Sequence, residues 1–134
     1  MSWSCESGSC LLVPSGPTGE HLFTVALGPK KLSGYGTEEQ VVVVSFSSVK
    51  PGLPYDKACE VAVGEHPFIL KDSYIYYREP RIYPISVVQD KVNNGEWRTH
   101  ERCDDLLIKK VLSGFRKSER LPRYFDEVLK EFDI

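Results

Sequence analysis

The chain has no long apolar run and no excess of positive charge. Of its 134 residues, 41% are hydrophobic and 27% are charged, and the formal net charge is −2. Apolar runs such as 41–44 are far shorter than the ~20 residues of a membrane-spanning helix, and the N-terminus has neither the basic start nor the apolar core of a secretory signal. We therefore expect one cytoplasmic domain over residues 1–134, with no membrane partner.

Cysteine is scarce, and its spacing does not indicate a metal site. The four cysteines form no C-x-x-C pair, and only two of them lie close together in the sequence. We therefore predict neither a metal nor another cofactor. In a reducing compartment the four side chains are expected to be free thiols, some of them buried as small apolar residues.

Several catalytic motifs are also absent. The chain contains no Gly-Lys-Ser or Gly-Lys-Thr and no Gly-x-Ser-x-Gly. The first absence argues against a phosphate-cradling nucleotide loop, and the second against a nucleophile-elbow hydrolase. The net negative charge further implies that any nucleic acid would bind a local basic patch rather than the whole surface.

The first part of the chain has the pattern of a small β-protein. Apolar runs rich in strand formers alternate with Gly and Pro clusters, and no helical spacing intervenes. We expect strands at 10–13, 21–27, 40–47, 58–63, 74–77 and 82–83. Short consecutive strands pair antiparallel and hide their edges by closing into a barrel.

Helical spacing begins after this region. Ser86 with Gln89 matches a capping box and predicts a first helix from 86 to about 95. A second is expected over 101–112, ended by Ser113-Gly114, and a third from Pro122. The predicted fold class is therefore α+β, mainly β: a small antiparallel SH3-like barrel over residues 10–85, followed by about three short helices in residues 86–134.

Polar, aromatic and cationic residues gather in segment 64–81. Because side chains alternate along a strand, Tyr74, Tyr76 and Arg78 share one face. Aromatic rings stack on bases and cations neutralise phosphate, so this face suits single-stranded RNA. Tyrosines also alternate along ordinary half-buried strands, so a purely structural interpretation stays open.

Residues of the chemistry that RNA cleavage without a metal needs are present. That reaction takes a base for the 2′-hydroxyl proton, an acid for the leaving 5′-oxygen and a cation for the phosphorane charge. The candidates for these roles are His66, Asp72, Arg78 and Arg81. Candidates for holding the substrate are Ser47, Ser48, Lys50, Ser73, Tyr74 and Tyr77. Spacing alone does not show whether these side chains converge.

Three segments together resemble a known family. The order of residues 19–27, 41–48 and 72–82 resembles the barrel core of PemK/MazF-type toxins of bacterial toxin–antitoxin systems, over roughly residues 10–85. The resemblance implies an SH3-like barrel, usually a homodimer, that cleaves single-stranded RNA without a metal and is inhibited by an antitoxin protein. Ser47 and Ser48 match the hydroxyl residues that end a strand of that family, whereas His21 stands where the family has an Arg.

A second hypothesis needs no catalysis. A small barrel can bind an extended protein or peptide segment, with Tyr74, Tyr76 and Tyr77 forming an aromatic groove. The acidic net charge favours this binding module, and the clustered His, Asp and Arg side chains favour the ribonuclease.

Overall fold

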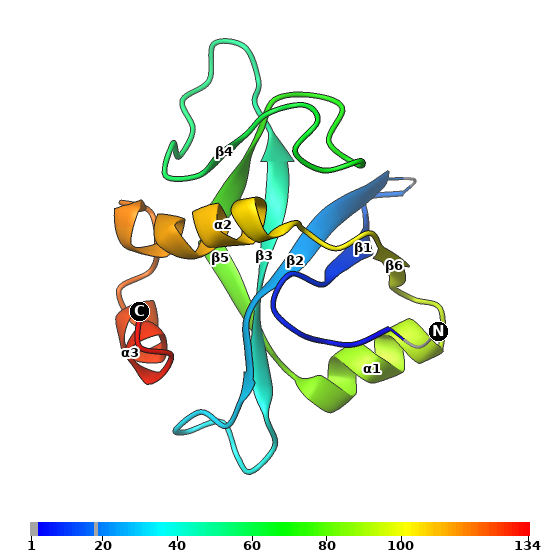
Figure 1. Ribbon diagram of the computed structural model, residues 1–134, viewed down its shortest axis with the longest axis vertical. Coiled ribbons are helices and arrows are strands. Elements are labelled where there is room, and N and C mark those ends of the chain that lie inside the picture. Colours follow the sequence, from blue (N-terminus) through cyan, green and yellow to red (C-terminus); the bar gives the residue numbers. More distant parts are fainter. Residues whose placement is uncertain (1–2, 18) are drawn as a thin grey trace.

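An antiparallel six-stranded sheet and three helices make up the computed structural model, which describes residues 3–17 and 19–134 (Figure 1). In chain order the elements are β1 (Cys10–Ser15), β2 (Gly19–Lys30), β3 (Gln40–Ser48), β4 (Glu60–Val61), β5 (Ser73–Pro84), α1 (Ile85–Asn93), β6 (Arg98–His100), α2 (Asp105–Lys117) and α3 (Phe125–Glu131). The predicted class, α+β and mainly β with three helices after the main strands, is confirmed. Among the described helices, none has the length and apolar character needed to cross a bilayer.

The sheet curls into a half-barrel. Its strand order is β4-β5-β3-β2-β1-β6, with antiparallel pairing throughout, so β4 and β6 are the end strands. The two runs predicted at 74–77 and 82–83 are one long strand, β5, with an irregularity inside it. Tyr76 faces Ser45 and Arg81 faces Val43, so five positions on β5 correspond to two on β3. Residues 77–80 therefore bulge out of the ladder.

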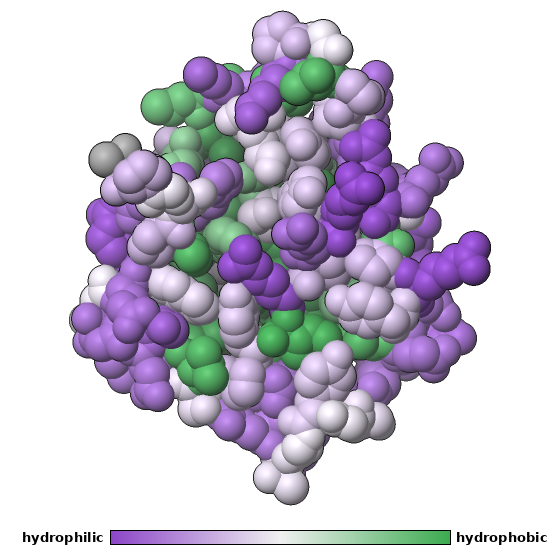
Figure 2. Space-filling view, turned by 180° about the vertical axis from the view of Figure 1, so that it is seen from behind, coloured by the Kyte–Doolittle hydropathy of each residue, from purple (hydrophilic) through white to green (hydrophobic). Residues whose placement is uncertain are grey.

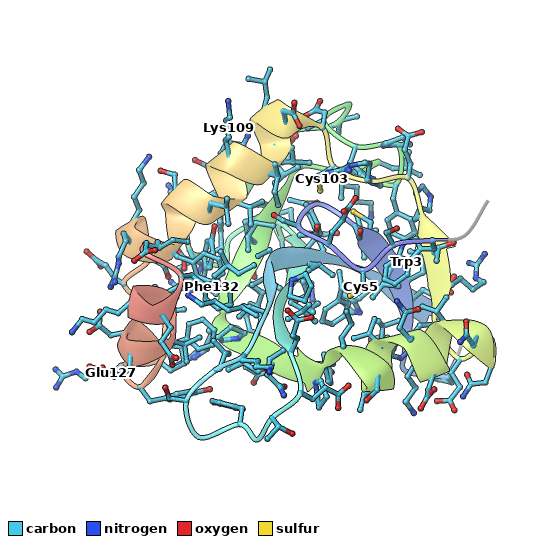
Figure 3. All side chains as sticks on the ribbon, turned by 60° about the horizontal axis from the view of Figure 1, so that its bottom comes forward. Trp3, Cys5, Cys103, Lys109, Glu127 and Phe132 are labelled. Atoms are coloured by element: carbon cyan, nitrogen blue, oxygen red, sulfur yellow. The ribbon has the colours of Figure 1, made fainter. Side chains whose placement is uncertain are left out.

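Strand β3 lies at the centre and is buried on both faces. Val42 and Val44 belong to a core with α2 and α3, while Val41 and Val43 belong to a second core with α1 and Trp97. This division follows from the alternation of side chains along a strand. Figure 1 shows α2 crossing one face of the sheet, and Figure 3 shows Phe132 directed from the α3 end toward the sheet while Glu127 points away.

The first helix begins differently from the prediction. It starts at Ile85, and no side chain caps it; the Ser86–Gln89 capping box is not formed. The backbone N–H of Ser86 instead donates to the carboxylate of Glu38, 2.7 Å away. A carboxylate from the β2–β3 connection therefore takes the place of the predicted capping box. A sequence motif confined to the helix start cannot predict this distant acceptor.

The second helix begins and ends later than predicted, at Asp105 and Lys117 rather than at 101 and 112. Asp104 caps it by accepting the N–H of Leu107 at 2.8 Å, and it runs to Lys117. The predicted stop at Ser113-Gly114 is wrong, because Gly114 serves packing rather than termination. A Cβ at Gly114 would overlap the hydroxyl of Tyr77 and lie 2.6 Å from its Cζ. Tyr77 is fully buried there and donates to the carbonyl of Val111 at 2.6 Å.

His66 joins the loop between β4 and β5 to the segment that follows β6. It is 2% exposed, and its Nδ1 accepts the N–H of Phe68 at 3.1 Å. Nε2 therefore carries the proton and donates to the carbonyl of Glu101 at 2.5 Å. Burial lowers the pKa of His66, so the folded protein favours the neutral ring that both bonds require.

We predict that Gly114→Ala destabilises the protein by about 1–3 kcal/mol, because overpacking against the Tyr77 ring outweighs the better helix propensity of Ala. Urea unfolding measures this. The matched control is Ser113→Ala, at an exposed position one residue earlier. Tyr77→Phe should lower the free energy of unfolding less in the Gly114→Ala background than in the wild type, because it removes the overlapping hydroxyl. Strictly additive losses for the two substitutions would contradict the contact between Gly114 and Tyr77.

We also predict that stability falls as the pH is lowered from about 7 to 5. The unfolded state takes up a proton on His66 near its ordinary pKa of about 6.5, whereas the folded state resists protonation, so the unfolded state binds more protons in this window. Urea unfolding at a series of pH values should show a smaller slope for His66→Gln than for the wild type. An unaltered slope in His66→Gln would refute the assignment.

Candidate functional site

One face of the sheet is only partly covered. Along the side of β3 that carries Val41 and Val43, the next two side chains are Ser45 and Ser47, both half-buried. The core made with α1 ends at this change from Val to Ser. A hollow of about 220 Å³ lies here, lined by Val13, Pro14, Ser15, His21, Phe23, Ser45, Ser47, Tyr76, Glu79 and Arg81. We call it the central hollow.

Two further hollows adjoin the central one. The first, about 300 Å³, shares His21 and Ser47 with it and is also lined by Ser48, Lys50, Leu53, Pro54, Tyr55 and Tyr74. The second, about 240 Å³, contains His21 and Ser48 together with Phe46, Phe68 and Lys71. His21 therefore lies where all three hollows meet. We call the central hollow and the adjoining hollow of about 300 Å³ together the sheet-face groove. Figure 2 views the molecule from this side and shows many residues of intermediate hydropathy in the middle of the face, with strongly hydrophilic and hydrophobic residues among them.

The Arg81 side chain packs over the ring of Phe23. Its guanidinium lies 4.8 Å from the centroid of the Phe23 ring, and Nη1 donates to the Tyr83 hydroxyl at 3.2 Å. Tyr83 in turn packs edge-on against Trp97. Within residues 3–17 and 19–134, no carboxylate forms a salt bridge with Arg81. Its charge is thus positioned by the fold and remains available to an anion.

Two tyrosines of β5 line the groove beside this cation. Tyr74 and Tyr76 are half-buried and two residues apart, so they share a face and are spaced about 7 Å along the strand. Tyr74 packs against Tyr55 with ring centroids 5.1 Å apart. The Tyr55 hydroxyl donates to Glu60 at 2.7 Å, which fixes that ring. The groove therefore offers aromatic surfaces at one end and a guanidinium at the other.

Part of the predicted site is brought together. Arg81 and Ser47 line the central hollow, and Ser47, Ser48, Lys50 and Tyr74 line the adjoining one. The predicted alternation along β5 also holds, with Ser73, Ile75 and Tyr77 buried on the opposite face.

The rest of the predicted site lies elsewhere. Asp72 lines a separate hollow with Glu60, Glu65 and Lys110. The Ser73 hydroxyl is buried and donates to the carbonyl of Lys71, although Ser73 lines the hollow of about 240 Å³ together with His21 and Ser48. Both ring nitrogens of His66 are engaged, Nδ1 by Phe68 and Nε2 by Glu101.

Two more predicted residues do not reach the groove. Tyr77 is buried under α2, where burial raises its pKa, and Arg78 is exposed in the β5 bulge and lines none of the hollows described here. His66, Asp72 and Arg78 therefore do not converge with Ser47 on one point.

Sequence reasoning missed His21 and Glu79 as members of the groove, whereas it placed Tyr76 on this face. His21 could have been found from strand periodicity, because it shares a face with Phe23 and Val25 and is exposed at the end of that row. Glu79 could not, since its position depends on the bulge, which shifts the alternation of β5. The residue types in the groove are those of acid–base chemistry and anion binding.

No metal site is found in the part of the chain that the structure describes: no group of three or more His, Cys, Asp or Glu side chains lies close enough to hold an ion. A scan against protein-family models finds no match, and a search of curated proteins finds none either.

Proposed function

We propose that the protein binds single-stranded RNA along the sheet-face groove and cleaves it at the central hollow without a metal. One observation carries this proposal: the central hollow is lined by a His, a carboxylate and an Arg from β2 and β5, beside the serines that end β3. The resemblance to PemK/MazF-type toxins supports it. In that setting the partners would be an antitoxin protein and a second copy of the chain.

The residues of the central hollow supply each role of the reaction. His21 and Glu79 are the two groups there that can take a proton from the 2′-hydroxyl and give one to the leaving 5′-oxygen. Arg81 stabilises the charge that develops on the phosphorane. Attack of the 2′-oxygen on phosphorus breaks the P–O5′ bond and leaves a 2′,3′-cyclic phosphate and a free 5′-hydroxyl.

The flanking residues fit the rest of the strand. Tyr74 and Tyr76 offer faces on which bases stack, and Lys50 adds a cation at the far end of the groove. The overall charge of −2 does not oppose this arrangement, because phosphate contacts depend on local cations.

Peptide binding without catalysis is the second candidate. Leu53 is 60% exposed and lines the groove next to Pro54 and the Tyr55–Tyr74 pair. An apolar side chain of an extended peptide would fit against these residues. This reading needs neither His21 nor Glu79.

We predict that the purified protein cuts long single-stranded RNA in the presence of EDTA and leaves 2′,3′-cyclic phosphate ends. Arg81→Ala should lower the cleavage rate about 100- to 1,000-fold, and His21→Ala about 100- to 10,000-fold. Lys109→Ala, which removes a cation from α2, is the control and should cleave normally.

Two outcomes of this assay would contradict the proposal. Intact RNA after incubation with folded, inhibitor-free protein would favour the peptide-binding module. Full activity in Arg81→Ala together with loss in Arg78→Ala would move the chemistry out of the central hollow.

We further predict that Tyr76→Ala weakens binding of a short single-stranded oligonucleotide by roughly 5- to 150-fold, the range expected for losing one stacked base. Fluorescence anisotropy at fixed salt measures the affinity. Tyr124→Ala is the matched control, because Tyr124 is exposed beside α3 and away from the groove. Equal weakening in both variants would show that the groove is not the binding surface.

A further inference from the structure

Two buried thiols lie in contact beneath the sheet edge. Cys10 of β1 is fully buried and Cys103 is 1% exposed, and their Sγ atoms are 3.5 Å apart. Residue 103 follows β6, which pairs with β1 and brings His100 opposite Cys10. Figure 3 shows Cys103 in the segment leading into α2, beside the strand that carries Cys10. The four cysteines are free, as predicted from the sequence.

We propose that Cys10 and Cys103 are an oxidation site at which a hydroperoxide forms a disulfide within the folded protein. The two sulfurs already touch, so bond formation requires a small further approach rather than a rearrangement of the fold. The 92 intervening residues include β2, β3 and β5, so the bond would close a loop around most of the sheet. Loops of this length restrict the unfolded chain strongly.

The surroundings make Cys103 the thiol that reacts first. Either sulfur of the contact can be the donor; with the Cys10 thiol as donor, its hydrogen bond holds the pKa of Cys103 below its ordinary value and raises that of Cys10. Burial raises the pKa of Cys5 and of Cys59 to about 11 each. Because the thiolate is the nucleophile, the pair is favoured over the two other buried thiols.

The reaction balances with one hydroperoxide. The Cys103 thiolate attacks the terminal peroxide oxygen and forms a sulfenic acid as the O–O bond breaks, and the hydroxide (from hydrogen peroxide) or alkoxide (from an organic hydroperoxide) that leaves takes up a proton. The Cys10 sulfur then attacks the Cys103 sulfur, forms the S–S bond and expels water, to which the Cys10 proton goes. Two electrons pass from the two thiols to the peroxide.

Access to the pair requires only a local opening. The neighbours of Cys103 in the chain, Arg102 and Asp104, are exposed. The segment is held by a bond from the Cys103 N–H to the Gly8 carbonyl at 2.9 Å, by the Arg102 guanidinium on the Ser7 carbonyl at 3.0 Å and on Glu6 at 3.3 Å, and by His66 on the Glu101 carbonyl at 2.5 Å. Edge segments with few such contacts open at a lower free-energy cost than the core.

The test is peptide mapping of the full chain after exposure to hydrogen peroxide in native buffer, with free thiols then alkylated under denaturing conditions. Trypsin together with a Glu-specific protease separates the four cysteines, because Glu6 lies between Cys5 and Cys10. The peptides are 1–6, 7–20, 58–60 and 103–109. We expect 7–20 linked to 103–109 as the main product, with Cys5 and Cys59 alkylated, native circular dichroism retained, and reversal by dithiothreitol.

Two variants make the assignment specific. Cys59→Ala removes another buried thiol of the same core and should keep the link. Cys10→Ala removes the resolving thiol, so Cys103 should accumulate as a sulfenic acid that dimedone traps. A link involving Cys5 or Cys59, free Cys10 and Cys103 after prolonged exposure of the folded wild type, or loss of the native spectrum on linking would each overturn the proposal.

Discussion

Burial of β3 on both faces is the constraint on which the rest of the structure depends. A strand with Val41, Val42, Val43 and Val44 in succession is stable only if both sides are covered. One side is covered by α2 and α3, the other by α1 and Trp97. All three helices, α1, α2 and α3, are used to cover β3. The helix on the second side is too short to reach Ser45 and Ser47, so this end of the face stays open and forms the sheet-face groove.

Strand β3 and its neighbour β5 together determine the shape of the groove and the position of its positive charge. The bulge in β5 keeps Tyr76 and Arg81 on one face although five positions separate them. Without the bulge, Arg81 would lie on the opposite face from Tyr76, because an odd separation reverses the direction of a side chain. The cation that the proposed chemistry requires is therefore placed by a backbone irregularity, and the Phe23 ring and Tyr83 hydroxyl then hold it.

Much of the fold could be predicted from the sequence, because strand alternation and helical spacing are local signals. They gave the α+β class, the main strands and the helical C-terminal part. The predicted helix ends were wrong where tertiary contacts determine them. Glu38 replaces the Ser86 cap at the start of α1, and Gly114 accommodates Tyr77 rather than ending α2. In the groove, Arg81, Ser47, Lys50 and Tyr74 are among the residues predicted from residue chemistry, strand alternation and the family resemblance. The location of Glu79 and the burial of His66 depend on a bulge and a loop fold that no short pattern encodes.

The most direct test of the central claim, that the open face of the sheet is the binding surface, is an NMR titration of the isotopically labelled protein with a single-stranded oligoribonucleotide that carries a 2′-O-methyl group at every position and cannot be cleaved. The account predicts chemical-shift changes concentrated at His21, at residues 45–50, and at 74–76 and 79–81. Changes confined to α2 and α3, on the other face of the sheet, would contradict it.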